Sequence, residues 1–398
     1  MSNVSSSNGL EKYPKLRFKG FSEPWQSASL GTMGTFIKGA PLSKADISTA
    51  GSPLILYGEL YTTYSEVAHE IQRKTDKIAE PQFYSRIGDV IMPTSGETPE
   101  DIATATCVMT PNVILAGDLL IYRTTAVDGR IISYAIKNKV NKQIASVAQG
   151  KSVVHVRAEE LGKVVISYPS KAEQEKIITM LALVEKKLVL QKELVETFKK
   201  YKRGLLQYIL RQEDGWKEVA LSEVLLERKT YCEKDGTYEH ATLSKDGVYG
   251  KTDRYNRDFL VTDEAKQYKI TKLGDLCYNP ANLKFGVICL NNYGDAIFSP
   301  IYITFEIDPK YNRDFIGLLL TRPDFINRAL KYQQGTVFER MAVSPEDLLS
   351  MKIRVPSLAV QEQISALFLS LEARIKSSEI VLEKMQHWKK QLMNDLFV

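Results

Sequence analysis

Two long segments of the chain carry apolar residues at a spacing of alternately four and three positions. The apolar positions of the first segment are Ile177, Leu181, Val184, Leu188, Val195, Phe198, Leu205 and Ile209. Those of the second segment are Ile364, Phe368, Leu371, Ile375, Leu382, Met385, Leu392 and Leu396. A mean spacing of 3.5 is typical of a coiled-coil seam, so each segment predicts one helix of roughly 40 residues and roughly 60 Å. We expect the two helices to pack on each other.

The two helical segments are copies of one another. Pro-Ser followed by Gln-Glu recurs from Pro169 to Pro356, 187 positions apart, and polar residues interrupt both stripes at the fifth and eighth places. A strand-like stretch precedes each helix, at 163–168 and 351–355. Ser170 with Glu173 predicts a capping box at the first helix, whereas Ser357 is expected to cap the second helix alone. Two helices of a helical bundle are a weaker alternative, because the rest of the chain is rich in β patterns.

Two further segments, in front of the helices, begin alike. Trp25 and Trp216 each stand five positions before a leucine and open a stretch of short β-rich runs separated by turn residues. The predicted order is therefore globule, helix, globule, helix. The expected boundaries are 1–168 for the first globule, with 1–12 disordered, 169–211 for the first helix, 212–355 for the second globule and 356–398 for the second helix.

Composition narrows the class of protein only slightly. A chain of 398 residues suggests two or three domains, and 44% hydrophobic with 25% charged residues is ordinary for a globular protein. The 53 Lys and Arg exceed the 48 Asp and Glu by a margin compatible with a polyanionic partner. The four cysteines form no C-x-x-C pair, so neither disulfides nor zinc are indicated. We find no apolar run of about 18 residues and no signal-peptide pattern, and expect a cytoplasmic protein without a membrane partner.

Catalytic motifs are incomplete in this sequence. An adenine methyltransferase needs an Asn/Asp-Pro-Pro-aromatic loop, and the nearest match, 279–282, lacks the second proline and the aromatic residue. There is no phosphate-binding Gly-x4-Gly-Lys-Ser/Thr motif. Candidate nuclease carboxylates such as Glu185 and Asp324 fall on unrelated predicted helices, and we interpret them as solvated charges. The sequence therefore predicts a chain that is not an enzyme and holds no metal or cofactor.

Turn-rich segments with basic, aromatic and amide side chains suit DNA binding, because they can anchor phosphates and contact base edges. In the first globule these candidate residues are Tyr57, Tyr61, Thr94, Ser95, Glu97 and Arg123. In the second globule they are Ser244, Lys245, Tyr249, Lys251, Arg254, Asn279, Asn282, Lys284, Gln334 and Arg340. The basic run 199–203 is explained as well by the helix dipole, and we leave it out of the site.

Taken together, these features resemble the specificity subunits of type I restriction-modification systems. The resemblance is carried by residues 14–21 with Trp25, by the two Pro-Ser-x-x-x-Gln-x-x-Ile helix starts, and by 204–207 with its counterpart 391–393. It implies an α+β fold in which two mixed α/β target recognition domains are separated by two long helices that pair as an antiparallel coiled coil, a pseudo-two-fold internal duplication. Each domain would read one half of a split, asymmetric site on double-stranded DNA.

The same resemblance implies the partners. Two modification subunits, which bind S-adenosylmethionine and methylate adenine, would dock on the helices, and two restriction subunits that use ATP and Mg could join them. Two other readings stay open from the sequence: a standalone adenine methyltransferase or nuclease with duplicated recognition domains, and a coiled-coil adaptor that binds no DNA.

Overall fold

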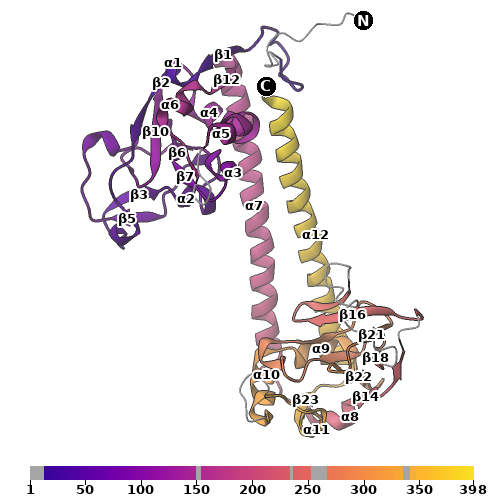
Figure 1. Ribbon diagram of the computed structural model, residues 1–398. Helices are drawn as coiled ribbons and strands as arrows, with labels where there is room; N and C mark the ends of the chain where they lie inside the picture. The colour runs from indigo at the N-terminus through magenta and orange to yellow at the C-terminus, as the bar shows by residue number, and fades with distance from the viewer. Residues whose placement is uncertain (1–12, 149–153, 234–235, 252–266, 335–340) are drawn as a thin grey trace, which may run out of the picture. The chain divides into compact units, whose positions relative to one another are not determined.

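The computed structural model describes residues 13–148, 154–233, 236–251, 267–334 and 341–398 (Figure 1). The segment expected to be disordered, 1–12, lies outside these residues. The chain divides into two compact units, Met1–Glu193 with Ile380–Val398 and Leu194–Glu379. Each unit contains one globule and one part of each of the two long helices, α7 (Lys171–Ile209) and α12 (Leu358–Leu396).

The first globule is built on a five-stranded sheet of order β2-β10-β6-β8-β4 and a three-stranded sheet of order β5-β3-β9. Its strands are β1 (Gln26–Ser29), β2 (Gly34–Lys38), β3 (Ser52–Leu56), β4 (Val67–Ala68), β5 (Arg73–Thr75), β6 (Asp89–Pro93), β7 (Ser95–Gly96), β8 (Thr106–Val108), β9 (Ile114–Ala116), β10 (Leu119–Thr124), β11 (Val154–His155) and β12 (Val165–Tyr168). Its helices are α1 (Leu30–Met33), α2 (Glu59–Thr62), α3 (Pro99–Ile102), α4 (Gly129–Ala135), α5 (Asn141–Val147) and α6 (Ala158–Lys163).

The second globule has a four-stranded sheet of order β14-β22-β19-β20 and a five-stranded sheet of order β15-β18-β21-β16-β17. Its strands are β13 (Lys217–Ala220), β14 (Leu225–Glu227), β15 (Tyr231–Cys232), β16 (Glu239–Ser244), β17 (Gly247–Gly250), β18 (Tyr268–Thr271), β19 (Leu276–Tyr278), β20 (Ile288–Leu290), β21 (Ala296–Phe298), β22 (Ile303–Ile307) and β23 (Lys352–Val355). Its helices are α8 (Leu221–Val224), α9 (Arg313–Leu320), α10 (Pro323–Ala329) and α11 (Pro345–Ser350).

The two globules share one framework. In each of them the first and last strands pair antiparallel, β1 with β12 and β13 with β23, directly before the long helix begins. The second strand of the five-stranded sheet in the first globule and of the four-stranded sheet in the second has equivalent neighbours, since β10 lies between β2 and β6, and β22 lies between β14 and β19. The predicted duplication and the predicted α+β fold are confirmed, as are the strands expected before each helix.

The start of each long helix is fixed to its globule by a glutamine of the repeated motif. The Gln174 side chain accepts a hydrogen bond from the backbone N–H of Asp128 at 3.0 Å and donates one to the Pro169 carbonyl at 2.9 Å. Gln361 makes the same two bonds, to the N–H of Asn312 and to the Pro356 carbonyl, each at 2.9 Å. Asp128 and Asn312 are the residues before α4 and α9, so the same joint connects equivalent helices in both units.

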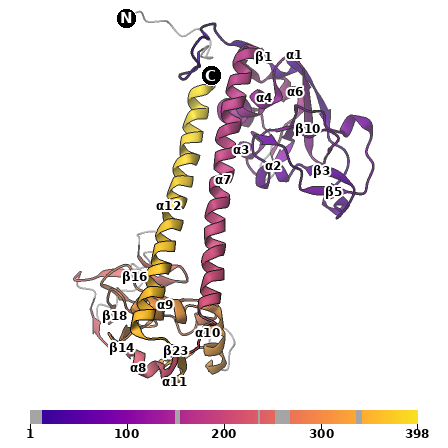
Figure 2. The same ribbon diagram turned by 180° about the vertical axis from the view of Figure 1, so that it is seen from behind.

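The helices pair antiparallel within each unit. In the first unit, the beginning of α7 lies beside the end of α12 (Figures 1 and 2). Leu181 of α7 and Leu396 of α12 belong to the same core there. In the second unit, Leu205 and Ile209 at the end of α7 pack on the core that contains Ile364 and Phe368 at the start of α12. All predicted seam positions are buried or half-buried.

The predicted helix caps are wrong. The Glu173 carboxylate does not fold back on Ser170; it is buried and paired with the Arg17 guanidinium at 2.8 and 2.9 Å. Among the described residues, the side chains of Ser170 and Ser357 donate or accept no hydrogen bond. The Glu173 carboxylate binds Arg17, which is 156 positions away, and the spacing of residues along the helix could not predict this contact.

Candidate nucleic-acid interface

In the first unit, four of the predicted DNA-binding residues line one pocket of about 450 Å³, namely Tyr57, Tyr61, Ser95 and Glu97. The hydroxyl of Tyr61, on α2, donates to the Ser95 carbonyl at 2.7 Å and so joins α2 to β7. Burial raises the pKa of Tyr61, so this hydroxyl stays a hydrogen-bond donor at neutral pH. The ring of Tyr57 and the exposed carboxylate of Glu97 remain available to a ligand at the pocket.

A second pocket, of about 1010 Å³, shares Tyr57, Gly58 and Thr62 with the first. Lys38 and Lys44 also line it, and neither lysine forms an ion pair with another described residue. Arg73, in contrast, is paired at 2.9 Å with the buried carboxylate of Glu59. The two pockets together place unpaired ammonium groups beside aromatic and polar side chains, a combination that suits phosphate anchoring and base contacts.

The other two predicted residues of this globule do not join these pockets. Arg123 lies on β10 with its guanidinium 3.1 Å from the buried Asp89 carboxylate, and it donates to the Tyr84 carbonyl at 2.7 Å. Thr94 uses its backbone N–H to bind the Asp118 carbonyl at 2.8 Å. Because the Arg123 side chain is only 12% exposed, its charge supports the fold, and we omit it from the proposed DNA surface.

In the second unit, two predicted loops lie next to each other. The Pro280 carbonyl accepts a hydrogen bond from the N–H of Val343 at 3.3 Å, which joins the loop after β19 to the segment that follows Gln334. Gln334 and Ala342 exchange two backbone hydrogen bonds of 3.0 Å and so close the base of the second loop. Its predicted contact residue Arg340 lies outside the described residues, as does Arg254 of the other predicted loop.

Within the loop after β19, the residues divide into structural and exposed groups. Asn279 is buried, and its side-chain oxygen accepts from the N–H of Ala281 at 3.1 Å and of Asn282 at 3.3 Å. Asn282 itself is exposed, and the Lys284 ammonium lies 5.4 Å from the centroid of the Phe285 ring. Asn279 therefore shapes the turn, while Asn282 and Lys284 are placed to contact a ligand.

The third predicted segment is the β16–β17 hairpin. The Ser244 hydroxyl accepts from the N–H of Asp246 at 3.1 Å and so orders the turn, and the exposed Lys245 has no described ion-pair partner. The Tyr249 hydroxyl donates to the Asp246 carbonyl at 2.9 Å, and the N–H of Lys251 donates to the His240 carbonyl at 2.8 Å. Lys245 is thus the residue of the hairpin best placed to meet a phosphate.

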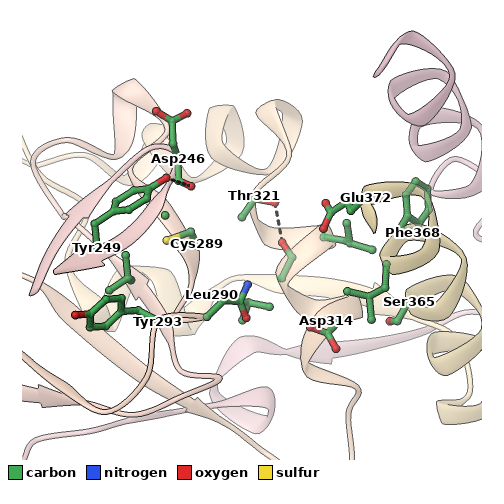
Figure 3. A pocket seen from close by; sticks show the side chains of 16 residues that line it. Asp246, Tyr249, Cys289, Leu290, Tyr293, Asp314, Thr321, Ser365, Phe368 and Glu372 are labelled. Carbon is green, nitrogen blue, oxygen red and sulfur yellow. Dashed lines mark hydrogen bonds between the residues drawn. The ribbon is translucent and has the colours of Figure 1, made fainter. Parts of the chain in front are cut away.

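Tyr249 also lines a pocket of about 440 Å³ between this hairpin and the first turns of α12 (Figure 3). Cys289 lies close to Tyr249 of the hairpin, and Glu372 of α12 lies on the opposite side (Figure 3). Asp246 and Asp314 add two further carboxylates to the lining. Three carboxylates would repel a phosphate, so we do not assign this pocket to DNA.

The outer faces of the two helices carry a feature that the seam analysis missed. Leu194 and Tyr201 of α7 are 42% and 56% exposed, and their equivalents 187 positions later, Val381 and Trp388 of α12, are 42% and 52% exposed. Each residue comes directly before a seam position, so the signal was present as a second apolar stripe beside the first. Exposed apolar side chains that recur in both copies are candidates for contact with another protein.

The basic run 199–203 is partly used within the helix pair. The ammonium groups of Lys199 and Lys202 form ion pairs with Glu379 and Glu372 of α12, the first at 2.9 Å. In the described parts of the chain we find no group of three or more His, Cys, Asp or Glu side chains that could hold a metal ion. Nor does any described helix have the length and apolar character needed to span a membrane.

By sequence, neither a protein-family profile nor a curated protein matches this chain. By structure, it is similar to the S subunit of a type I restriction-modification system from M. genitalium, with a TM-score of 0.60 at 14% identity, covering 97% of this chain and 99% of that one. A chain from a structural study of complex assembly and conformational transition of the type I restriction-modification system gives a TM-score of 0.57 at 14% identity, with 94% and 97% covered. The chain therefore has the fold of a type I restriction-modification S subunit.

Proposed function

We propose that this chain is the DNA-specificity subunit of a type I restriction-modification complex, and that it reads a two-part, asymmetric DNA sequence without catalysing a reaction itself. The observation that carries the proposal is the duplicated framework with unlike loops. Both globules share the strand pairing and the glutamine joint. Their candidate DNA residues differ, because those of the first globule line the pocket of Tyr57, whereas those of the second lie on the β16–β17 hairpin and in the loop after β19. Two globules with the same framework and different candidate DNA surfaces suit a DNA site that consists of two different sequence blocks.

Recognition would combine two kinds of contact. Ammonium groups that have no described ion-pair partner, those of Lys38, Lys44 and Lys245, would anchor phosphates without sequence preference. Side chains at the pocket of Tyr57 and Glu97, and Asn282 in the second unit, would read base edges, because amide, carboxylate and hydroxyl groups distinguish base pairs in the major groove. Lysine contacts thus supply affinity, and the neighbouring polar groups supply specificity.

The helices would bind the catalytic partners. Tyr201 and Trp388 occupy equivalent places on α7 and α12, as do Leu194 and Val381, so the chain offers the same apolar contact twice. Duplicate contacts suit two copies of one partner, and we assign them to two modification subunits. Those subunits would bind S-adenosylmethionine and methylate adenine, and restriction subunits that use ATP and Mg would complete a nuclease.

A methyltransferase role for the chain itself gains no support from the near match at 279–282. In an adenine methyltransferase the side chain of this asparagine must be free to hold an extruded base, but the oxygen of Asn279 is used to close its own turn. The residue is also buried. We therefore place the methyl-transfer chemistry in the partner.

The proposal is tested by mapping methylated adenines on DNA treated with S-adenosylmethionine and the chain, with or without the modification subunit. We expect no methylation by the chain alone, and methylation of a bipartite sequence by the complex. Exchanging residues 25–168 for the first globule of another specificity subunit should change one block and leave the other intact. Methyl transfer by the isolated chain, or a change in both blocks, would contradict the proposal.

A further inference from the structure

The lysine at the eighth position of each seam forms an ion pair with a glutamate of the other helix. Lys202 and Lys389 are 187 positions apart, and so are Glu185 and Glu372. In the second unit the Lys202 ammonium pairs with Glu372, and in the first unit the Lys389 ammonium pairs with Glu185. Glu185 is therefore not the solvated charge that its sequence context suggested. Each pair joins α7 to α12 within its own unit.

The pair in the first unit has a third member. The Lys389 ammonium also lies 2.9 Å from the carboxylate of Glu66, which belongs to the first globule. Glu66 directly precedes β4, the edge strand of the five-stranded sheet, and its carbonyl accepts from the N–H of Cys107 at 2.9 Å. At Lys202, the described residues offer no carboxylate of the second globule in this role.

The ion pair of Lys389 with Glu66 is also more deeply buried than that of Lys202 with Glu372. The side chains of Lys389 and Glu66 are 17% and 12% exposed, whereas those of Lys202 and Glu372 are 28% and 50% exposed. Charges that are shielded from water interact more strongly and are screened less by salt. Burial disfavours the charged form of Lys389, yet the two carboxylates outweigh it and raise the pKa of this lysine. The ammonium is thus permanently charged at neutral pH.

From this geometry we infer that Lys389 is a positioning residue, which fixes the orientation of the first recognition domain on the helix pair by binding Glu66. The inference rests on the proposed function. The first globule is held at the start of α7 by Gln174 and at its sheet edge by Lys389, and two joints on different elements restrict rotation as well as translation. The second globule has the equivalent of the glutamine joint and lacks an equivalent of the Lys389 joint among the described residues.

Loss of the joint should therefore affect one half of the DNA site. In Lys389→Met, the first domain keeps its fold and its loops but is aimed less accurately, so we expect about tenfold weaker discrimination at the block it reads and tolerance of an altered spacer. The block read by the second domain should be unchanged. Lys202→Met is the matched control, since it removes the equivalent ion pair from the helices and leaves both blocks and the spacer unchanged.

The experiment uses the full chain bound to the modification subunit, with methylation of a randomised DNA library in the presence of S-adenosylmethionine. The first block is identified by exchanging residues 25–168. Lys389→Arg should restore discrimination, and Glu66→Gln should reproduce the Lys389→Met result. The double variant of Glu66→Gln with Lys389→Met should be no worse than either single variant, because both act through one contact.

Loss at both blocks, or unchanged discrimination in a folded Lys389→Met complex, would overturn the inference. Gel filtration with the modification subunit checks that assembly is intact. If the wild-type complex shows no bipartite methylation, the proposed function fails, and amide hydrogen exchange then decides on the joint alone. Faster exchange at Cys107 and β4 in Lys389→Met than in Lys202→Met would support it, and equal exchange would refute it.

Discussion

The two compact units differ in their loops and agree in the way each globule is attached to the start of its long helix. In both units an antiparallel strand pair closes the globule, and a glutamine side chain at the helix start accepts a hydrogen bond from a backbone N–H of the globule. Between these fixed points the first unit places a tyrosine-lined pocket, and the second unit places two adjacent loops. The comparison shows that attachment at the helix start is duplicated, whereas the candidate ligand surface and the Lys389 contact differ between the units.

A second contrast concerns the charges that support the sheets. Asp89 and Asp275 occupy equivalent positions, and each accepts the N–H of the residue three places earlier at 2.8 Å. Asp89 pairs with Arg123 of β10, whereas Asp275 pairs with Arg228, which follows β14. The carboxylate has a fixed place in the framework, and the arginine that neutralises it comes from a different strand in each copy.

The largest loss of unfolding free energy is expected from substitutions that disrupt the helix seam in one unit at a time. Leu181 and Phe368 are equivalent and each only 1% exposed, in the first and second unit respectively. Substitution of either by alanine should cost about 2–5 kcal/mol of unfolding free energy, because it leaves a cavity among packed side chains. Denaturant unfolding of the purified chain measures this. Leu183→Ala, at an exposed position of the same helix, is the control and should change little; an equal loss there would mean that the seam is misassigned.

A smaller loss of unfolding free energy is expected when either of the two buried aspartates, Asp89 and Asp275, is replaced by asparagine. Asp89→Asn should cost about 2–3 kcal/mol, because it removes a charged hydrogen bond and leaves the Arg123 guanidinium without a carboxylate. Asp275→Asn should cost less, since Arg228 keeps a second carboxylate, Glu306, at 3.1 Å. Thermal unfolding of both variants provides the comparison, and the reverse order would show that the second carboxylate contributes nothing.

The two glutamine joints should contribute less to the unfolding free energy than the aspartates do, and each should contribute the same amount. Gln174→Leu and Gln361→Leu each leave one backbone N–H and one proline carbonyl without a partner, at a cost of about 1–3 kcal/mol. Amide exchange at Asp128 in the first variant and at Asn312 in the second should accelerate. Protection retained in either variant would indicate that water or another group replaces the amide there.

The smallest expected effect is the pH dependence of the contribution of Glu66 to the stability of the first unit. Burial raises the pKa of Glu66, but Lys389 and Lys137 lower it by more, so the net pKa lies below its ordinary value of 4.5. A lowered pKa means that Glu66 stabilises the fold fully above about pH 4.5, and that this contribution is lost as the pH falls through the folded-state pKa. The stability difference between wild type and Glu66→Gln should therefore shrink below pH 4.5. A difference that stays constant down to pH 3 would contradict the assignment.

Much of the fold could be predicted from the sequence because the repeated helices depend on periodicity, which is a local property. Ile177 and Ile364 have the same spacing to their neighbours, and both are buried in the structure. The pairing of Lys389 with Glu66 could not be predicted, since the two residues are 323 positions apart and meet only in the folded chain. The ion pairs between the two helices did leave a signal in the sequence, because Glu185 and Glu372 each lie 17 positions before a seam lysine.

The candidate DNA surface was predicted less completely for the same reason. Tyr57, Tyr61, Ser95 and Glu97 lie in one pocket, as their turn-rich segments suggested. Arg123 and Asn279 were chosen for their chemistry, and the structure uses both to support the fold. Whether a polar side chain faces a ligand or its own backbone depends on tertiary packing, and residue type and spacing carry no information on it.

The glutamine joint has a consequence for how such a chain can evolve. Each glutamine binds one backbone N–H of its globule and the carbonyl of the proline that precedes its own helix, and both partners are backbone atoms. Every amino acid except proline presents the same N–H, so mutation can replace the loops almost freely without dissolving the attachment. Under the proposed function, one globule would therefore acquire a new DNA preference by recombination or drift, while the other globule and the two helices would be inherited unchanged.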